Sequence, residues 1–343
     1  MQVQQSTSLL PYNTFGIDAK AQFFASFSNL EELKSLLAYR KAQSSPNKIL
    51  PLMILGGGSN ILLTKDFEGL VLKNELKGIE LVREDADHYY VKAAAGEVWH
   101  ELVEYCIAHN YAGLENLSLI PGNVGASPMQ NIGAYGVEIK DVFHELEALN
   151  INEETIHTFS NTDCEFGYRE SVFKNKLKGQ FIILNVTFRL QKHPVLNTSY
   201  GAIKEQLELM GEKELTIKNI SQAIINIRTS KLPNPKEIGN AGSFFKNPQI
   251  SKFKLHVLWD DYPDVVAYEV NSLTYKLAAG WLIEKCGWKG IRRGDAGCHA
   301  KQALVLVNYG NATGKEILDL STEIISSVKE KFGVELEREV NIL

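Results

Sequence analysis

A run of eight residues places a hydroxyl, an ammonium and a carboxamide group within five positions. It reads Asn240-Ala241-Gly242-Ser243-Phe244-Phe245-Lys246-Asn247. These three kinds of group donate hydrogen bonds to negative charge, so the run suits a site for an anionic substrate. The simpler alternative is that Ser243 only caps a turn after Gly242, which is a common use of serine.

Two further segments carry charged groups that such a site would use. Residues 166–174 contain Arg169, whose guanidinium stays protonated and binds carboxylates through two parallel hydrogen bonds. Residues 336–340 contain Glu337 and Glu339, which lie two positions apart and therefore on one face of an expected strand. An ion pair between Arg169 and Glu170 is the alternative for the first segment. In the second, either glutamate could be the inward carboxylate.

Two glycine-rich segments with little charge also stand out. The first is Gly56-Gly57-Gly58-Ser59-Asn60, and the second spans residues 121–136, with four glycines among serine and amide side chains. The first lacks the Gly-Lys-Ser/Thr of a P-loop and the third glycine of a G-x-G-x-x-G fingerprint. Glycines still let backbone N–H groups approach a diphosphate, although a plain tight turn is the alternative for this segment alone. Together the two segments indicate a dinucleotide with a neutral ring system.

Composition narrows the class of protein. A chain of 343 residues that is 44% hydrophobic is long enough for two or three domains. A net charge of -5 gives no electrostatic reason to expect a nucleic acid or a membrane surface as partner. The first residues lack the pattern of a signal peptide, and no apolar run approaches the ~20 residues that span a bilayer. The four cysteines are widely spaced, without metal-ligand spacing. We expect a cytoplasmic protein with free thiols and no metal site, acting on small molecules.

Helices and strands are expected where apolar residues repeat at regular spacing and are bounded by capping or stop residues. A capping box from Ser28 to Glu31 opens one helix, and another from Thr313 to Glu316 opens a helix that Gly333 ends. A domain boundary is expected after Pro194. The expected helices cover 30–43, 98–110, 202–210, 221–230 and 313–332, and the expected strands cover 48–55, 181–190, 301–308 and a last one from Val334 that presents Glu339.

These segments, in this order, resemble those of the UDP-N-acetylenolpyruvoylglucosamine reductases, the MurB flavoenzymes of peptidoglycan precursor synthesis. The resemblance extends to Asn13-Thr14-Phe15-Gly16 and covers nearly the whole chain. It implies an α+β fold: a two-part FAD-binding domain of the vanillyl-alcohol-oxidase/PCMH type over residues 1–195, split near residue 75, and a C-terminal α+β domain over residues 196–343 that binds the UDP-sugar substrate.

The resemblance also implies an activity and its residues. The expected reaction is the NADPH-dependent reduction of UDP-N-acetylglucosamine enolpyruvate to UDP-N-acetylmuramate through non-covalently bound FAD, in a monomer. Arg169, assisted by Glu339, would stabilise the substrate carboxylate or enolate, and Ser243 would deliver a proton. The implied FAD ligands are Gly56, Gly57, Gly58, Ser59, Asn60, Pro121, Gly122, Asn123, Gly125, Ala126, Ser127, Gln130, Asn131 and Gly133. The implied substrate ligands are Tyr135, Tyr168, Tyr200, Arg228, Lys231, Asn247 and Gln302, with Tyr200 as the mobile tyrosine that closes over the diphosphate in the type I branch.

Two positions depart from the family pattern, and two other functions compete. Arg338 stands where the family usually has proline, and Asn341 stands where it has a basic residue; we expect Arg338 to lie on the wrong face to replace that residue. A flavin oxidase or dehydrogenase acting on another substrate would keep both glycine segments without needing Arg169, Ser243 and Glu339 together. A non-catalytic protein that binds flavin or a UDP-sugar would lack a competent acid.

Overall fold

The computed structural model describes residues 2–45, 47–212 and 214–343. Residues 1 and 46 of the first predicted domain and residue 213 of the second lie outside the described residues. The chain forms two compact units. Unit 1 comprises Met1–Thr7, Ala21–Gly57 and Glu68–Ser230, and unit 2 comprises Ser8–Lys20, Gly58–Phe67 and Lys231–Leu343. Both units contain helices and sheets, which confirms the α+β class. The functional division at residue 195 stays a prediction.

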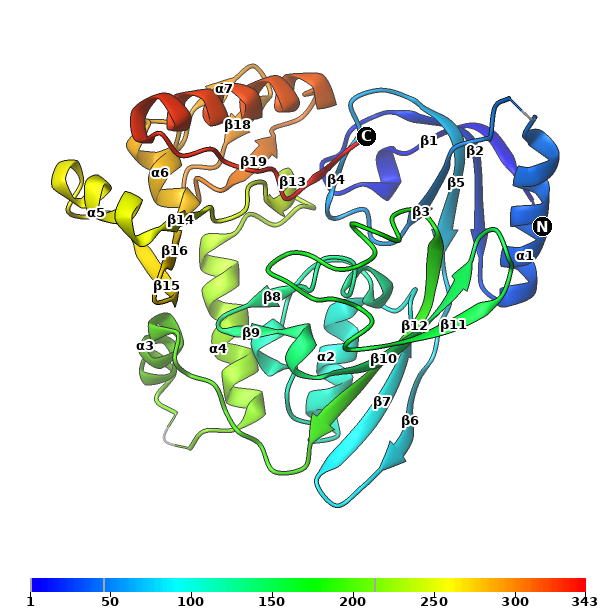
Figure 1. Ribbon diagram of the computed structural model, residues 1–343, viewed down its shortest axis with the longest axis horizontal. Helices are drawn as coiled ribbons and strands as arrows, with labels where there is room; N and C mark the ends of the chain where they lie inside the picture. Colours follow the sequence, from blue (N-terminus) through cyan, green and yellow to red (C-terminus); the bar gives the residue numbers. More distant parts are fainter. Residues whose placement is uncertain (1, 46, 213) are drawn as a thin grey trace. The chain divides into compact units, whose positions relative to one another are not determined.

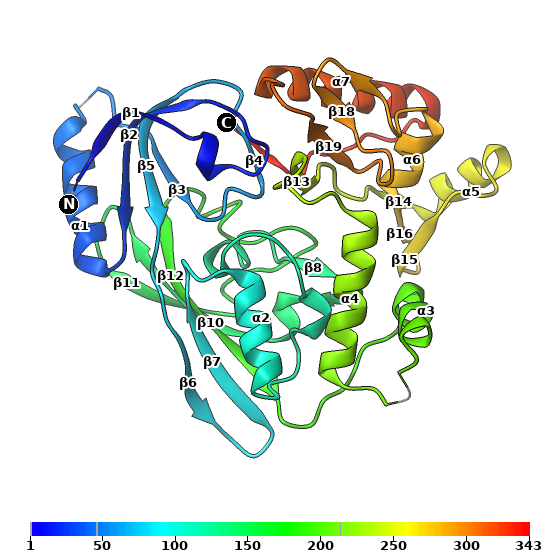
Figure 2. The same ribbon diagram turned by 180° about the vertical axis from the view of Figure 1, so that it is seen from behind.

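The first sheet of unit 1 packs against helix α1 (Leu30–Gln43), as Figures 1 and 2 show. Its strand order is β1 (Gln4–Ser8), β2 (Lys20–Phe27), β5 (Phe67–Asn74) and β3 (Leu52–Leu55). Leu33, Leu36 and Leu37 lie on one face of α1 and are buried against apolar side chains of the sheet. Strand β3 is parallel to β5 and ends at Leu55, so the first glycine segment follows a strand, as the sequence predicts.

The second sheet of unit 1 is antiparallel and carries helix α2 (Trp99–Ala108). Its strand order is β11 (Ile156–Ser160), β10 (Phe143–Asn150), β12 (Phe181–Gln191), β7 (His88–Ala94) and β6 (Ile79–Glu84). Trp99 is buried, and its ring meets that of Phe188 edge-on at 5.7 Å between centroids. The second glycine segment lies between α2 and β10 in the chain and is fixed by this core.

Shorter elements complete unit 1. Helices α3 (Gly201–Met210) and α4 (Ile217–Lys231) share a small apolar core of their own. The remaining elements are β8 (Gly133–Ala134), β9 (Val137–Glu138) and the 3-10 turns η2 (Glu115–Leu117), η3 (Val124–Ala126) and η4 (Ile139–Asp141).

In unit 2, helix α7 (Gly314–Phe332) packs against β18 (Ala296–Cys298) and β19 (Val305–Asn308), as Figure 1 shows. These strands belong to a sheet with β13 (Gly239–Ser243) and β17 (Arg292–Arg293). Ile317, Leu320 and Ile324 repeat at three- and four-residue spacing and are buried. The other elements are η1 (Leu10–Tyr12), β14 (Gln249–Ser251), β15 (Ala267–Asn271), β16 (Thr274–Leu277), α5 (Lys252–Asp261), α6 (Ala279–Lys285) and the parallel pair β4 (Ile61–Leu62) and β20 (Asn341–Ile342).

The predicted helices are confirmed, with changes at their starts. The capping box of Thr313 with Glu316 is present, and Gly333 ends α7 with φ of 60°. The predicted box of Ser28 with Glu31 is wrong by one residue. Asn29 Oδ1 accepts from the N–H of Glu32 at 2.9 Å, and the Glu32 carboxylate accepts from the N–H of Ser28 at 2.7 Å. Helix α4 begins four residues before the predicted start, at Ile217.

The strand predicted over 181–190 is confirmed as β12, and two other predicted strands are confirmed in their later parts. The strand expected over 48–55 starts at Leu52, because Pro51 has no N–H to pair. The strand expected over 301–308 starts at Val305. The expected last strand is mostly an extended segment that forms a single bridge, between Arg338 and Phe245, before β20 begins at Asn341.

Two further predictions concern the state of the cysteines and membrane-spanning helices. Cys106, Cys164, Cys286 and Cys298 are free thiols, as predicted, and burial raises the pKa of Cys164 and of Cys298 to about 12. Within the described part of the chain, no helix has both the length and the apolar character needed to cross a bilayer.

Candidate functional site

The two glycine segments meet in unit 1 at backbone contact distance. A Cβ atom added to Gly57 would lie 2.9 Å from the Cα of Gly122, and one added to Gly56 would lie 3.4 Å from the Cβ of Asn123. A Cβ on Gly125 would lie 2.6 Å from the Cβ of Ala95. Side chains are excluded at Gly57 and Gly125, because real Cβ atoms do not approach within 3.0 Å without displacing a neighbour, whereas Gly56 lies at ordinary contact distance.

Polar side chains of the second segment hydrogen bond to its own backbone and to neighbouring segments. Asn123 Nδ2 donates to the carbonyl of Gly96 at 2.7 Å, and Ser127 Oγ donates to the carbonyl of Val124 at 2.7 Å. Asn131 is buried with φ of 44°, and its Nδ2 donates to Glu138 at 2.8 Å and to the carbonyl of Gly167 at 3.0 Å. These amide and hydroxyl groups fix the loop shape, so a ligand would meet chiefly the loop backbone.

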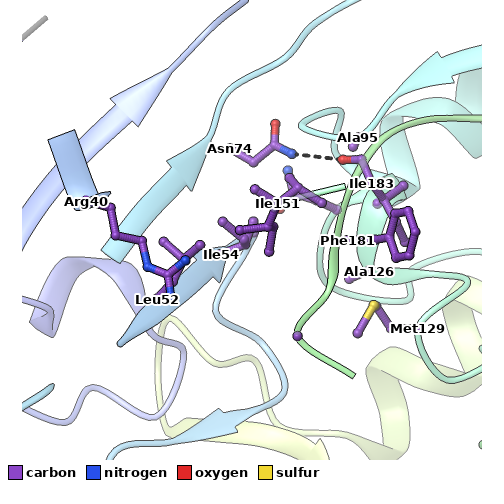
Figure 3. Close-up of a pocket in the computed structure, with 15 residues that line it drawn as sticks. Arg40, Leu52, Ile54, Asn74, Ala95, Ala126, Met129, Ile151, Phe181 and Ile183 are labelled. Carbon is purple, nitrogen blue, oxygen red and sulfur yellow. Dashed lines mark hydrogen bonds between the residues drawn. The ribbon is translucent and has the colours of Figure 1, made fainter. Parts of the chain in front are cut away.

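A cavity of about 310 Å³ in unit 1 is lined by both glycine segments and by both sheets (Figure 3). Among the described residues that line it, Arg40 is the only charged one. Its Nε donates to the carbonyl of Leu50 at 2.8 Å. Beside the first loop, Lys73 Nζ donates to the carbonyl of Gly56 at 2.5 Å, and burial lowers its pKa. A largely apolar cavity with glycine loops, cations and no lining carboxylate fits a dinucleotide diphosphate such as that of FAD.

Sequence reasoning missed part of this cavity. Arg40, Asn74 and Phe181 line it, although they come from a helix and two strands that were expected only as framework. Arg40 lies in the last turn of α1, where a cation is favourable near the helix end, so its type and position alone indicate no ligand site. The three residues come from α1, β5 and β12, and only the folded structure brings them to one cavity.

The rest of the first segment belongs to unit 2. Gly58 has φ of 63°, and an added Cβ would lie 2.0 Å from the carbonyl oxygen of Tyr12. The Asn60 carbonyl accepts from the backbone N–H of Asn341 at 3.1 Å and from its Nδ2 at 2.9 Å. Asn341, which departs from the family pattern, therefore anchors this segment.

Arg169 sits in a tight turn of unit 1 with φ of 57°. Its Nη2 donates to the carbonyl of Gly133 at 2.8 Å, in the second glycine segment, and its guanidinium carbon lies 5.6 Å from the centre of the Tyr168 ring. The Arg169 carbonyl in turn accepts from Lys174 Nζ at 3.2 Å. The guanidinium is thus oriented toward the glycine segment by fixed backbone.

Three more predicted substrate residues meet in unit 1. The ring of Tyr135 contacts the ring of Tyr200 edge-on, with 5.2 Å between centroids. Arg228 hydrogen bonds to the Tyr135 side chain; burial raises the pKa of Tyr135, and Arg228 partly offsets the rise. Tyr200 is 41% exposed and directly precedes α3. Asn197 holds this loop by accepting from Ser199 Oγ at 2.7 Å.

Ser243 lies at the end of β13 in unit 2, with its side chain exposed. The preceding Gly242 has φ of 71°, and its N–H donates to Asn240 Oδ1 at 3.0 Å. The following Phe244 and Phe245 are buried, and the N–H of Phe244 donates to the carbonyl of Leu304 at 2.7 Å. An exposed hydroxyl is therefore carried on a backbone that is fixed on both sides.

The segment with Glu337 and Glu339 runs beside the Ser243 segment. The N–H of Glu339 donates to the carbonyl of Phe244 at 2.8 Å, and the N–H of Lys246 donates to the carbonyl of Glu337 at 2.9 Å. The buried Lys246 ammonium pairs with Glu337 Oε1 at 2.5 Å. The Glu337 carboxylate is therefore held by an ion pair, whereas the role of Glu339 stays a prediction.

Other predicted residues of unit 2 make local contacts. Asn247 Oδ1 accepts from the N–H of Ala279 at 2.9 Å, and Gln302 Oε1 accepts from the N–H of Leu304 at 3.4 Å. Lys231 is exposed at the end of α4. Arg338 Nε donates to Ser321 Oγ at 2.8 Å on α7, as expected for a side chain turned to the other face.

Comparison with known proteins agrees with these features. Residues 234–343 match the model of the UDP-N-acetylenolpyruvoylglucosamine reductase C-terminal domain, and residues 21–160 match that of an FAD binding domain. UDP-N-acetylenolpyruvoylglucosamine reductase of Flavobacterium johnsoniae is 52% identical over the whole of both chains, and that of Amoebophilus asiaticus is 51% identical over the same extent. The enzyme of Pseudomonas syringae pv. tomato is 49% identical over 100% of this chain and 99% of its own.

Solved structures give the same fold. The crystal structure of UDP-N-acetylenolpyruvylglucosamine reductase (MurB) from Thermus caldophilus matches with a TM-score of 0.68 at 23% identity, over 100% of this chain and 99% of that one. The identity to curated relatives, over the full length of both chains, is about twice as high. This chain belongs to the UDP-N-acetylenolpyruvoylglucosamine reductase family.

Proposed function

We propose that this chain is an FAD-dependent enzyme that uses NADPH to reduce UDP-N-acetylglucosamine enolpyruvate to UDP-N-acetylmuramate, in peptidoglycan precursor synthesis. The observation that carries the proposal is the pairing in unit 2 of the Ser243 segment with the Glu339 segment, through the hydrogen bond from the Glu339 N–H to the Phe244 carbonyl. A flavin-binding protein without chemistry would not need an exposed serine on a strand end that is hydrogen bonded to a segment with two glutamates.

The loops of unit 1 would hold FAD. Backbone groups at Gly57 and Gly122 would face its diphosphate, because a Cβ on Gly57 would lie 2.9 Å from the Cα of Gly122 and Gly122 has φ of 111°. NADPH would first reduce the bound FAD. The reduced FAD would then supply the hydride that adds to one carbon of the alkene.

Arg169 stabilises negative charge on the substrate in this proposal. Addition of hydride to the electron-rich enolpyruvyl ether is favourable only if its carboxylate is polarised, so that charge can develop as an enolate. The Arg169 guanidinium suits this role because Gly133 orients it through the 2.8 Å hydrogen bond. A donor that is already oriented needs no reorganisation when the charge develops.

Ser243 delivers the proton to the other carbon of the alkene. A serine hydroxyl is a weak acid, so its position matters more than its intrinsic acidity. The paired backbone on both sides of Ser243 fixes that position. Glu339 would assist as the neutral acid, which can donate a hydrogen bond to the developing enolate, because an ionised carboxylate would repel it.

The remaining predicted residues would bind the substrate. Arg228, Tyr135 and Tyr200 would contact the anionic UDP-sugar, since a buried guanidinium and two phenols donate hydrogen bonds to phosphate oxygens. We further infer that the enzyme works as a monomer in the cytoplasm. Tyr168, Lys231, Asn247 and Gln302 are proposed as additional substrate contacts.

The experiment is an assay of the purified, FAD-loaded protein with NADPH carrying deuterium on the transferred position. We expect NADPH oxidation that depends on the enolpyruvyl UDP-sugar, and a product containing one deuterium by mass spectrometry. A flavin oxidase of the same fold would instead consume oxygen and leave the enolpyruvyl ether unreduced. NADPH oxidation at the same rate without the UDP-sugar would contradict the proposal.

A further inference from the structure

A continuous series of contacts in unit 1 leads from helix α2 to the two tyrosines of the proposed substrate site. His100, in the first turn of α2, accepts at Nδ1 a hydrogen bond from the N–H of Leu119 at 3.0 Å. The Leu119 carbonyl accepts from Arg228 Nε at 3.2 Å. Arg228 hydrogen bonds to Tyr135, whose ring contacts Tyr200. His100 itself has no assigned role in the chemistry described above.

Leu119 is a residue whose backbone needs support. Its φ is 57°, in the left-handed region that costs a non-glycine residue roughly 1 kcal/mol or more. The preceding Ser118 is buried and hydrogen bonds to Ser221 Oγ at 2.8 Å, which ties the segment to α4. His100 satisfies the Leu119 N–H, and the carbonyl of the same residue meets Arg228. Loss of the His100 acceptor would therefore leave Leu119 less fixed, and Leu119 is the residue whose carbonyl positions the Arg228 guanidinium.

Arg228 is sensitive to such a change because it is a buried cation. Burial lowers its pKa, and Tyr135 opposes that effect. Within the described residues, no carboxylate forms an ion pair with Arg228; its acceptors are the Leu119 carbonyl and the Tyr135 oxygen. A buried guanidinium held only by neutral acceptors keeps its full charge for an anionic ligand. Its position then depends strongly on those two acceptors.

We propose that His100 is a positioning residue for the substrate: as a neutral acceptor it holds Leu119, whose carbonyl fixes Arg228 and, through it, Tyr135 for the anionic UDP-sugar. The inference rests on the proposed function. It assigns His100 an effect on substrate affinity and none on the reduction of flavin by NADPH.

The protonation state of His100 follows from the geometry. Nδ1 accepts, so Nε2 carries the proton, and Nε2 lies 3.7 Å from Glu104 Oε1. Burial lowers the pKa of His100, and Arg228 lowers it further, whereas Glu104 and Glu101 raise it. Falling pH would place a proton on Nδ1, facing the Leu119 N–H, and would add a cation near Arg228. Substrate affinity should therefore weaken on acidification.

The test uses the full-length, FAD-loaded enzyme and two variants at one position. His100→Leu removes the acceptor. His100→Asn keeps an acceptor, because an amide oxygen on a short side chain lies close to where Nδ1 lies. The matched control is His109→Leu, an exposed histidine after the end of the same helix. We measure KM for the enolpyruvyl UDP-sugar, the rate of flavin reduction by NADPH, and KM from pH 8 to pH 5.5.

His100→Leu should raise KM about tenfold, which is the loss of one hydrogen bond, with normal flavin reduction. His100→Asn should return KM to within about threefold of wild type and remove most of the rise in KM on acidification. The control should match wild type. The pH profiles of wild type and His100→Asn decide the question even if His100→Leu fails to fold.

Two results would overturn the inference. One is an unchanged KM in His100→Leu together with a pH-independent wild-type KM. The other is an equal loss in both variants that also slows flavin reduction, which indicates packing alone. A wild-type enzyme that leaves the enolpyruvyl UDP-sugar unreduced would instead contradict the proposed function, and the inference with it.

Discussion

The glycine loops of unit 1 and the Ser243 segment of unit 2 are built in opposite ways. The loops work by lacking side chains: Gly57 and Gly122 approach within a distance that excludes a methyl group. The Ser243 segment works by presenting a side chain, on a strand end that Phe244 and Phe245 anchor in the core. In the proposed function, backbone shape would therefore govern cofactor binding, whereas side-chain identity would govern the chemistry on the substrate.

This difference separates two kinds of damage. A bulkier residue in a glycine loop displaces backbone and should lower FAD occupancy. The rates of both half-reactions should then fall in proportion to the fraction of protein that holds FAD. A change at Ser243 leaves backbone and cofactor in place and should affect one half-reaction only. The expected effects of single substitutions in the two regions decrease in the order Ser243, Gly125, Tyr200 and Glu337.

Ser243→Ala should slow reoxidation of the reduced flavin by the enolpyruvyl UDP-sugar by about 10²- to 10⁴-fold, because a positioned proton donor is lost. Flavin reduction by NADPH should stay near wild type, since it needs no proton from Ser243. Stopped-flow absorbance of each half-reaction measures both rates. Ser326→Ala, an exposed serine on α7, is the control. Reoxidation at the normal rate would remove Ser243 from the chemistry.

Gly125→Val should weaken FAD binding by about 10- to 100-fold, because the added Cβ meets Ala95 at 2.6 Å and overpacking costs about 1–3 kcal/mol. Titration of the apoprotein with FAD, followed by flavin fluorescence, measures the affinity. Gly201→Val is the control, since a Cβ there would meet nothing within 4 Å. Equal FAD affinity in both variants would break the contrast between loop backbone and side chains.

Tyr200→Phe should raise the apparent substrate constant by about one to two orders of magnitude. A phenol that donates to an anion contributes about 1.5–3 kcal/mol, and the ring contact with Tyr135 remains in the variant. Steady-state kinetics with varied UDP-sugar measure the change, and Tyr268→Phe, at an exposed tyrosine of unit 2, serves as control. If flavin reduction by NADPH weakens equally, Tyr200 is a packing residue.

Glu337→Gln should change substrate reduction by less than about fivefold, whereas Glu339→Gln should slow it much more. The Glu337 carboxylate is 70% exposed, and such ion pairs contribute at most about 1 kcal/mol. Single-turnover reoxidation of reduced flavin compares the two isosteric variants directly. The reverse order of effects would assign the catalytic role to Glu337.

The sequence predicted the elements whose signals are local. Helix α7 has its capping box at Thr313 and Glu316 and its stop at Gly333, and all three are in place because each depends only on neighbouring residues. The start of α4 and the late start of β3 were missed. Pairing with another strand or core decides those ends, and a single sequence does not show its partners.

The site followed the same rule. The glycine segments and the Ser243 run could be recognised because their residue types are unusual for framework. Arg40, Lys73 and His100 could not, because each looks like an ordinary residue of a helix or strand. Their roles depend on contacts made in three dimensions, such as that of Lys73 Nζ with the Gly56 carbonyl.

The most direct test of the central claim is an anaerobic double-mixing experiment on the wild-type, FAD-loaded protein. The protein is first mixed with NADPH and then with UDP-N-acetylglucosamine enolpyruvate, and the flavin absorbance near 450 nm is followed throughout. We expect NADPH to bleach the flavin and the enolpyruvyl UDP-sugar to restore its absorbance with formation of one UDP-N-acetylmuramate per flavin. Flavin that NADPH bleaches but that stays bleached on addition of the enolpyruvyl UDP-sugar would contradict the account.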